Sequence, residues 1–125
     1  METFVEKQIL IVDDLPSLRH QMRNLVGKLG ITRILEAGNG QEAWELLQAH
    51  PVHCVLLDWE MPVMNGLQLL ERLKADTALA GVPVLMITAK GDELLKAVKL
   101  GVNGFLIKPV NEAICLSKLT EILSK

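Results

Sequence analysis

Five polar residues in this chain have the chemistry to bind or transfer a phosphoryl group, and each stands at or just past the end of a short apolar run. They are Asp13, Asp14, Asp58, Thr88 and Lys108. Carboxylates brought together repel one another, and a hard divalent cation such as Mg²⁺ would relieve that repulsion. A lysine ammonium and a threonine hydroxyl are donors suited to phosphoryl oxygens. These residue types indicate phosphoryl transfer to a carboxylate, with Asp58 as the nucleophile.

The apolar runs before these residues are typical of strands buried on both faces of a parallel sheet. The run before Asp58 is Cys54–Leu57, and the others are Gln8–Val12, Val84–Ile87 and Gly104–Ile107. Because the carboxyl ends of parallel strands meet at one edge, we expect the five polar side chains to lie together there. Any one alone would pass for an ordinary strand-end residue, whereas the set favours a site.

Helical spacing of apolar residues follows each run, and Arg33–Glu36 reads as a further short strand. The expected helices are Pro16–Leu29, the segment between Asn39 and His50, the segment from Gly66 through Lys74, Glu93–Leu100, and the segment from Asn111 through Leu123. Strand and helix alternate five times with short connections, which predicts an α/β fold with a parallel sheet and helices on both faces. No linker or repeat interrupts this pattern, so residues 1–125 are expected to form one domain.

Composition argues against several classes of partner. The net charge of this 125-residue chain is −2, and its Lys and Arg are scattered, so neither nucleic acid nor a membrane surface is expected to attract it. No apolar stretch reaches the length of a spanning helix, and residues 1–7 lack a signal-peptide pattern. Cys54 and Cys115 are expected to be reduced packing residues. The chain is expected to be a cytoplasmic monomer.

As a set, these motifs resemble the receiver domain of bacterial two-component response regulators. The motifs are Asp13-Asp14, Asp58 with Met61-Pro62 and Gly66, Thr88-Ala89, and Lys108-Pro109. The similarity runs from about Gln8 to the C-terminus, and it extends to the single-domain chemotaxis response regulators through Asp58–Leu67 and Pro83–Ala89. The resemblance implies a flavodoxin-like (βα)5 fold with strand order 2-1-3-4-5. It also implies a signalling switch that assists its own phosphorylation and dephosphorylation and is not a turnover enzyme.

By this resemblance, Asp58 accepts a phosphoryl group from a sensor histidine kinase, with Mg²⁺ as the cofactor. Asp14 and Asp58 are expected to bind the ion directly together with the backbone carbonyl of Glu60, and Asp13 is expected to act through water.

Thr88 and Lys108 are expected to bind the phosphoryl oxygens, with Lys108-Pro109 as a cis peptide. Phosphorylation would draw Thr88 toward the new group. Phe105 matches the family's aromatic switch position and would turn inward to fill the space left behind. Chemotaxis members commonly have Tyr there. Phe lacks the hydroxyl, so its inward and outward states are expected to differ mainly in burial.

Three neighbouring residues are expected to tune or report the site. Glu60 and Lys90 lie two residues beyond Asp58 and Thr88. We hypothesise that they pair across the site and slow dephosphorylation. Trp59 is expected to be exposed to the site, so that Mg²⁺ or a phosphoryl analogue would change its fluorescence.

Output is expected through protein contacts, because no DNA-binding or catalytic segment follows Lys125. The expected surface comprises Glu93–Leu100, Phe105 and Asn111–Leu123. The first interpretation is chemotaxis, with a flagellar motor switch component as target and a phosphatase as a further partner. The alternatives are a phosphorelay or regulatory shuttle, or a receiver cut from a larger response regulator or hybrid kinase.

Two other classes share this architecture. A Mg²⁺-dependent aspartyl-phosphate phosphatase would need a second carboxylate two residues after its nucleophile, which Glu60 mimics, but the chain has no cap region to hold a substrate. A flavodoxin-like electron carrier would need a Ser/Thr/Gly-rich phosphate loop after the first strand. The segment Asp13–Pro16 stands there instead and would repel phosphate unless a metal were bound.

Overall fold

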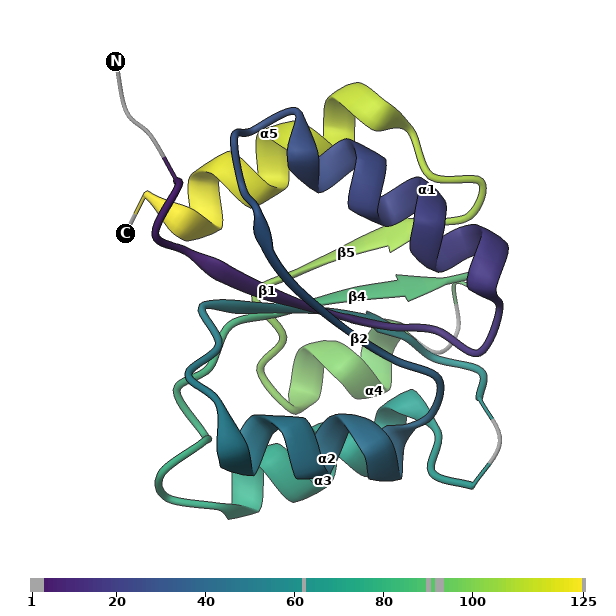
Figure 1. Cartoon of the computed structure of the whole chain (residues 1–125). Coiled ribbons are helices and arrows are strands. Elements are labelled where there is room, and N and C mark those ends of the chain that lie inside the picture. Colours follow the sequence, from purple (N-terminus) through teal and green to yellow (C-terminus); the bar gives the residue numbers. More distant parts are fainter. Residues whose placement is uncertain (1–3, 62, 90, 92–93, 125) are drawn as a thin grey trace.

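The fold alternates strand and helix along the chain. A computed structural model describes residues 4–61, 63–89, 91 and 94–124 (Figure 1). The strands are β1 (Gln8–Val12), β2 (Arg33–Ala37), β3 (Cys54–Asp58), β4 (Val84–Thr88) and β5 (Gly104–Ile107). The helices are α1 (Pro16–Gly27), α2 (Gly40–Ala49), α3 (Gly66–Ala75), α4 (Leu94–Lys99) and α5 (Glu112–Leu123). The predicted alternation is confirmed.

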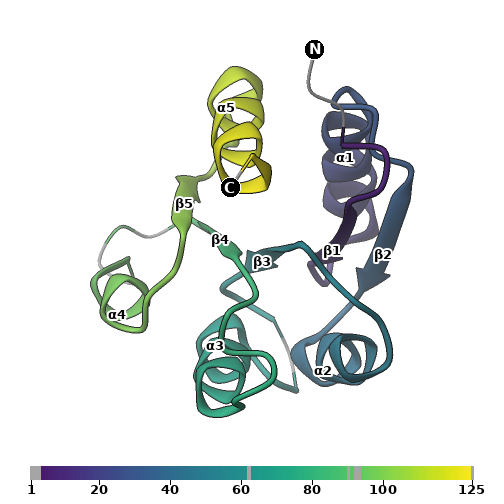
Figure 2. The ribbon, with the colours of Figure 1, turned by 90° about the vertical axis from the view of Figure 1, so that its left-hand side faces the viewer.

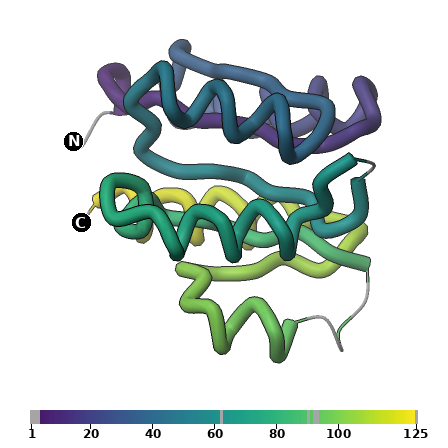
Figure 3. The backbone as a smooth tube through the Cα atoms, turned by 90° about the horizontal axis from the view of Figure 1, so that it is seen from below, coloured from purple at the N-terminus to yellow at the C-terminus, as the bar shows by residue number. Residues whose placement is uncertain are grey.

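The strands form one parallel sheet in the order β2-β1-β3-β4-β5, as predicted. Helices α1 and α5 cover one face, and α2, α3 and α4 cover the other (Figure 2). Figure 3 views the second face of the sheet, where α2, α3 and α4 lie in front of the strands. Parallel strands need a crossover connection, and here α1, α2, α3 and α4 supply the four that join successive strands, whereas α5 follows β5. All five carboxyl ends therefore lie at the same edge.

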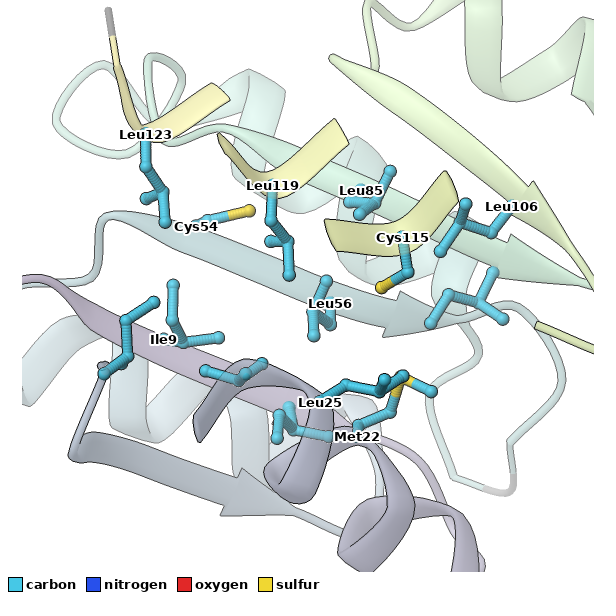
Figure 4. Packing of buried hydrophobic residues seen from close by; sticks show 14 of the residues in the cluster. Ile9, Met22, Leu25, Cys54, Leu56, Leu85, Leu106, Cys115, Leu119 and Leu123 are labelled. Atoms are coloured by element: carbon cyan, nitrogen blue, oxygen red, sulfur yellow. The ribbon is translucent and has the colours of Figure 1, made fainter. Parts of the chain in front are cut away.

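Each sheet face carries its own apolar core, because successive side chains of a strand point to opposite faces. Leu56 of β3 packs with α1 and α5 on one face, whereas Leu57 packs with α2 and α3 on the other. Cys54 and Cys115 are free, buried thiols in the first core (Figure 4). Burial raises the pKa of Cys54 to about 12 and that of Cys115 to about 11, so both stay protonated at neutral pH. Their predicted packing role is confirmed.

Asparagines begin three of the helices. The side chains of Asn39 and Asn111 accept the N–H of the residue three positions on, which caps the first turn of α2 and of α5. Asn65 and Gln68 form a reciprocal capping box at α3.

Helix α1 is shorter than predicted, and helix α4 ends at Lys99, one residue before the predicted Leu100. Helix α1 ends at Gly27, because residues 28–30 tighten into i→i−3 hydrogen bonds before Gly30, which has a φ of 81°. Helix α4 begins at Leu94, and the predicted start at Glu93 lies outside the described residues. Within the described residues, no helix has the length and apolarity needed to cross a membrane.

Candidate functional site

Strand register brings the predicted residues to one place. Asp58 pairs with Ile87 across β3 and β4, and Thr88 pairs with Ile107 across β4 and β5. The N–H of Lys108 donates to the carbonyl of Thr88 at 2.8 Å, so pairing continues past the end of β5. Asp58 and Thr88, which end β3 and β4, and Lys108, which follows β5, therefore lie side by side at the carboxyl edge.

An acidic cluster occupies the centre of this edge. One carboxylate oxygen from each of Asp13, Asp14 and Asp58 lies within 4.8 Å of the other two. Asp13 and Asp58 are only 5% and 3% exposed, whereas Asp14 is exposed at the mouth. Oδ1 of Asp13 accepts the N–H of Leu15 at 2.9 Å, which anchors that carboxylate to the turn after β1.

Lys108 reaches the central carboxylate. Its Nζ lies 2.8 Å from Oδ1 of Asp58, and the Lys108–Pro109 peptide is cis, as expected. Apart from this ammonium, the buried oxygen has no hydrogen-bond donor within the described part of the chain. A lone pair is thus left for a ligand or a reacting atom.

The electrostatics of the cluster favour a cation. Burial raises the pKa of Asp58 to about 6, and Asp13 and Asp14 add to the rise while the Lys108 ammonium opposes it. Burial also raises the pKa of Asp13, although the Leu15 N–H partly offsets this. Burial would lower the pKa of Lys108, but the charges of Asp58, Asp13 and Glu60 raise it instead.

The donor set fits Mg²⁺. That ion prefers oxygen ligands, typically one or two carboxylates with water and phosphate oxygens. Here three carboxylates converge, and one buried Asp58 oxygen has no hydrogen-bond donor other than Lys108 within the described residues. A divalent cation would remove the mutual repulsion that raises the pKa of Asp58.

Thr88 and Phe105 lie on the same side of adjoining strands. Met86 pairs with Phe105 across β4 and β5. Thr88 lies two residues beyond Met86, so its side chain points to the same face of the sheet. Thr88 is 1% exposed, whereas Phe105 is 37% exposed. The Lys118 ammonium lies 5.7 Å from the centre of the Phe105 ring. The ring is thus in an outward position, and its switch role stays a prediction.

Glu60 is exposed at the rim of an open pocket of about 400 Å³ next to Asp58. Asp14, Met61 and Lys108 also line this pocket. Lys90 lies outside the described residues, so its pairing with Glu60 stays a prediction.

The expected exposure of Trp59 to the site is wrong. Trp59 is 7% exposed and packs in the core beneath α2 and α3. Its N–H donates to the carbonyl of Ile87 at 3.0 Å, so strand pairing continues one residue beyond Asp58. The alternation of side chains therefore turns Trp59 to the face opposite Asp58.

Gly66 was noted in the sequence only as part of a motif and as a helix start, and Arg19 escaped the reasoning from sequence altogether. A Cβ on Gly66 would lie 2.5 Å from the Asp58 carbonyl oxygen, so only glycine lets α3 begin so close to β3. Arg19 donates from Nη1 to the carbonyl of Asp13 at 2.6 Å. An arginine on a helix gives no sign of such a contact, although its spacing from Arg23 puts both on one helix side.

Comparison with known proteins agrees with this fold and site. Residues 9–120 match the response regulator receiver domain family, and the chain belongs to that family. The family prediction is therefore confirmed.

Within this family, the chain is similar to chemotaxis proteins of the CheY type along nearly its whole length. Chemotaxis protein CheY1 of Helicobacter pylori (strain J99) is 40% identical over 119 residues, covering 93% of this chain and 96% of the relative. The CheY homolog of Campylobacter jejuni (serotype O:23/36) is 36% identical over 119 residues, covering 93% and 92%. The crystallised chemotaxis protein CheY4 of Vibrio cholerae has a TM-score of 0.84 at 26% identity, covering 94% of this chain and 98% of that one.

The same fold occurs inside larger signalling proteins. The receiver domain of a signal transduction histidine kinase from Syntrophus aciditrophicus has a TM-score of 0.86 at 26% identity, covering 94% of this chain and 90% of that one.

Proposed function

We propose that this receiver domain is a phosphorylation-activated switch in which a histidine kinase transfers a phosphoryl group to Asp58. The observation that carries the proposal is the buried Asp58 oxygen that lies 2.8 Å from Lys108 Nζ and has no other donor among the described residues. A nucleophile needs an available lone pair, and phosphoryl transfer needs positive charge beside the reacting oxygens.

Each residue has a distinct task in this mechanism. An Asp58 oxygen forms a bond to phosphorus as the bond from phosphorus to the kinase histidine breaks. Lys108 offsets the negative charge of the phosphoryl group, and the Thr88 hydroxyl donates to one of its oxygens. Asp13, Asp14 and Asp58, with the backbone carbonyl of Glu60, would hold Mg²⁺. When bound, that ion supplies further charge neutralisation at the phosphoryl oxygens.

Readout is proposed to run through Thr88 to Phe105 and onto an apolar surface of α4, β5 and α5. Five large apolar side chains on these elements are at least one-third exposed: Leu95, Val98, Phe105, Ile107 and Ile114. Exposed apolar side chains gathered on neighbouring elements mark interaction sites. Four of these side chains belong to the region expected from the sequence, and Ile107 is added to it.

The proposed pathway is chemotaxis, with a flagellar motor switch component as the target. It is supported by the CheY-named relatives, which match nearly the whole chain. The protein is proposed to act as a cytoplasmic monomer and as a switch without substrate turnover. A phosphorelay shuttle is the second candidate, because receiver domains with the same fold also occur in histidine kinases.

The test is phosphorylation by a small-molecule phosphodonor with Mg²⁺, followed by intact mass measurement of the native chain and Asp58→Asn. We expect the mass of one phosphoryl group on the native chain, no gain on Asp58→Asn, and no gain when the metal is chelated. Continuous release of phosphate from phosphomonoesters would overturn the switch proposal in favour of a phosphatase.

A further inference from the structure

The turn that carries Asp13 and Asp14 leads into a helix with no conventional cap. Leu15 occupies the N-cap position of α1, makes no side-chain capping hydrogen bond, and is 50% exposed. The first turn of α1 contains no acidic residue. Besides the bond from the Leu15 N–H to Asp13 Oδ1, neither a capping side chain nor burial of Leu15 therefore holds this turn in place.

Arg19 connects the turn to the edge of the sheet. Its Nη1 donates to the carbonyl oxygen of Asp13 at 2.6 Å, and its Nε donates to Oε1 of Glu36 at 3.2 Å. Glu36 belongs to β2, and its other oxygen accepts from Arg23 at 2.7 Å. The Arg19 side chain is 20% exposed, so this bridge is partly protected from water.

We propose that Arg19, held by Glu36, is a positioning residue for the metal site. The carbonyl that Arg19 holds belongs to the peptide between Asp13 and Asp14. Because a peptide is planar, fixing this carbonyl also fixes the direction in which the chain enters Asp14. The planar guanidinium can hold the carbonyl and Glu36 together through different N–H groups. This inference rests on the proposed Mg²⁺ site.

Positioning and simple charge predict opposite results. If only charge mattered, removing the Arg19 cation would strengthen Mg²⁺ binding, because like charges repel. If Arg19 positions the turn, its removal weakens Mg²⁺ binding, since outer partners of a metal site typically contribute 10–100-fold to affinity. The direction of the change therefore separates the two explanations.

Arg23 offers a matched control. It lies one helical turn beyond Arg19, pairs with the same Glu36, and makes no hydrogen bond or ion pair with Asp13 among the described residues. The experiment measures Mg²⁺ binding to the full chain by isothermal titration calorimetry, without phosphodonor. We expect Arg19→Gln to weaken binding about tenfold and Arg23→Gln to change it less than about twofold. Unfolding midpoints without Mg²⁺ are expected to fall similarly in both variants.

Arg19→Lys keeps the proposal testable even if Arg19→Gln does not fold. An ammonium keeps the charge but lacks the planar fork, so weaker Mg²⁺ binding is expected here too. Unchanged or stronger binding in the Arg19 variants, or equal weakening in Arg23→Gln, would overturn the positioning role. Absence of Mg²⁺ binding by the native chain would instead overturn the proposed metal site, and the positioning role with it.

Discussion

Ionised Asp58 is expected to destabilise the folded chain when no metal is bound. Burial and the charges of Asp13 and Asp14 raise its pKa to about 6. Without Mg²⁺, we expect Asp58→Asn to increase the free energy of unfolding at pH 7 by about 1–2 kcal/mol, because the neutral amide avoids the cost of burying a charge. Urea unfolding in the presence of a chelator measures this change.

The matched control is Glu71→Gln, an exposed carboxylate on α3. Its effect is expected to stay within about 0.5 kcal/mol. A loss of stability in Asp58→Asn would contradict the account of charge repulsion at the site.

The same pKa predicts a pH dependence of stability. Folded Asp58 binds its proton more tightly than in the unfolded chain, whose value is near 3.8. Its contribution to stability is therefore fully present below about pH 4 and is lost as pH rises through about 6. Glu36 acts in the opposite direction, because Arg23 lowers its pKa.

The comparison between the native chain and Asp58→Asn isolates Asp58 from other carboxylates. We expect the stability advantage of Asp58→Asn to shrink between pH 7 and pH 4.5, measured by urea unfolding without Mg²⁺. An advantage that does not change with pH would contradict the raised pKa.

At the scale of elements, the contact between β3 and α3 determines where Asp58 sits. A Cβ at Gly66 would lie 2.5 Å from the Asp58 carbonyl oxygen and 2.8 Å from the Trp59 Cα, and neither backbone atom can move aside cheaply. Gly66→Ala is therefore expected to reduce the free energy of unfolding by about 1–3 kcal/mol. It is also expected to slow phosphorylation of Asp58.

Gly27→Ala is the control, because a Cβ there meets no atom within 4 Å. Gly27 ends α1, and alanine is expected to stabilise the chain by about 0.4–1 kcal/mol. Thermal or urea unfolding of both variants is sufficient, and equal effects would show that the close approach at Gly66 is unimportant.

Strand ends and helix starts could be predicted from sequence where the residue type by itself determines the local structure. Apolar runs ending in Asp58 and Thr88 marked two strands, and Asn39 and Asn111 marked two helix starts. Trp59 was assigned wrongly, because its orientation depends on continued pairing with Ile87 in another strand.

The support around the site depends on partners distant in sequence. Arg19 escaped notice because its partners, Asp13 and Glu36, belong to other segments. Spacing along one helix reveals which residues share a side, but not which loop or strand that side meets.

At the scale of the whole molecule, one sheet separates two cores, and the site lies at its edge. Mg²⁺ bound at that edge would stabilise the entire fold, because the proposed site is assembled only in the folded chain. At about ten times its dissociation constant, Mg²⁺ is expected to add about 1.4 kcal/mol to the free energy of unfolding. The gain should appear equally in Trp fluorescence and in circular dichroism, and it should largely disappear in Asp58→Asn.

Asp58 is proposed to carry the phosphoryl group. The most direct measurement is to phosphorylate the native chain with a small-molecule donor and Mg²⁺, reduce the acyl phosphate with borohydride, and map the reduced residue by peptide mass spectrometry. The account predicts reduction of Asp58 alone. A phosphoryl group on His20, His50 or His53, or reduction at Asp13 or Asp14 in place of Asp58, would contradict it.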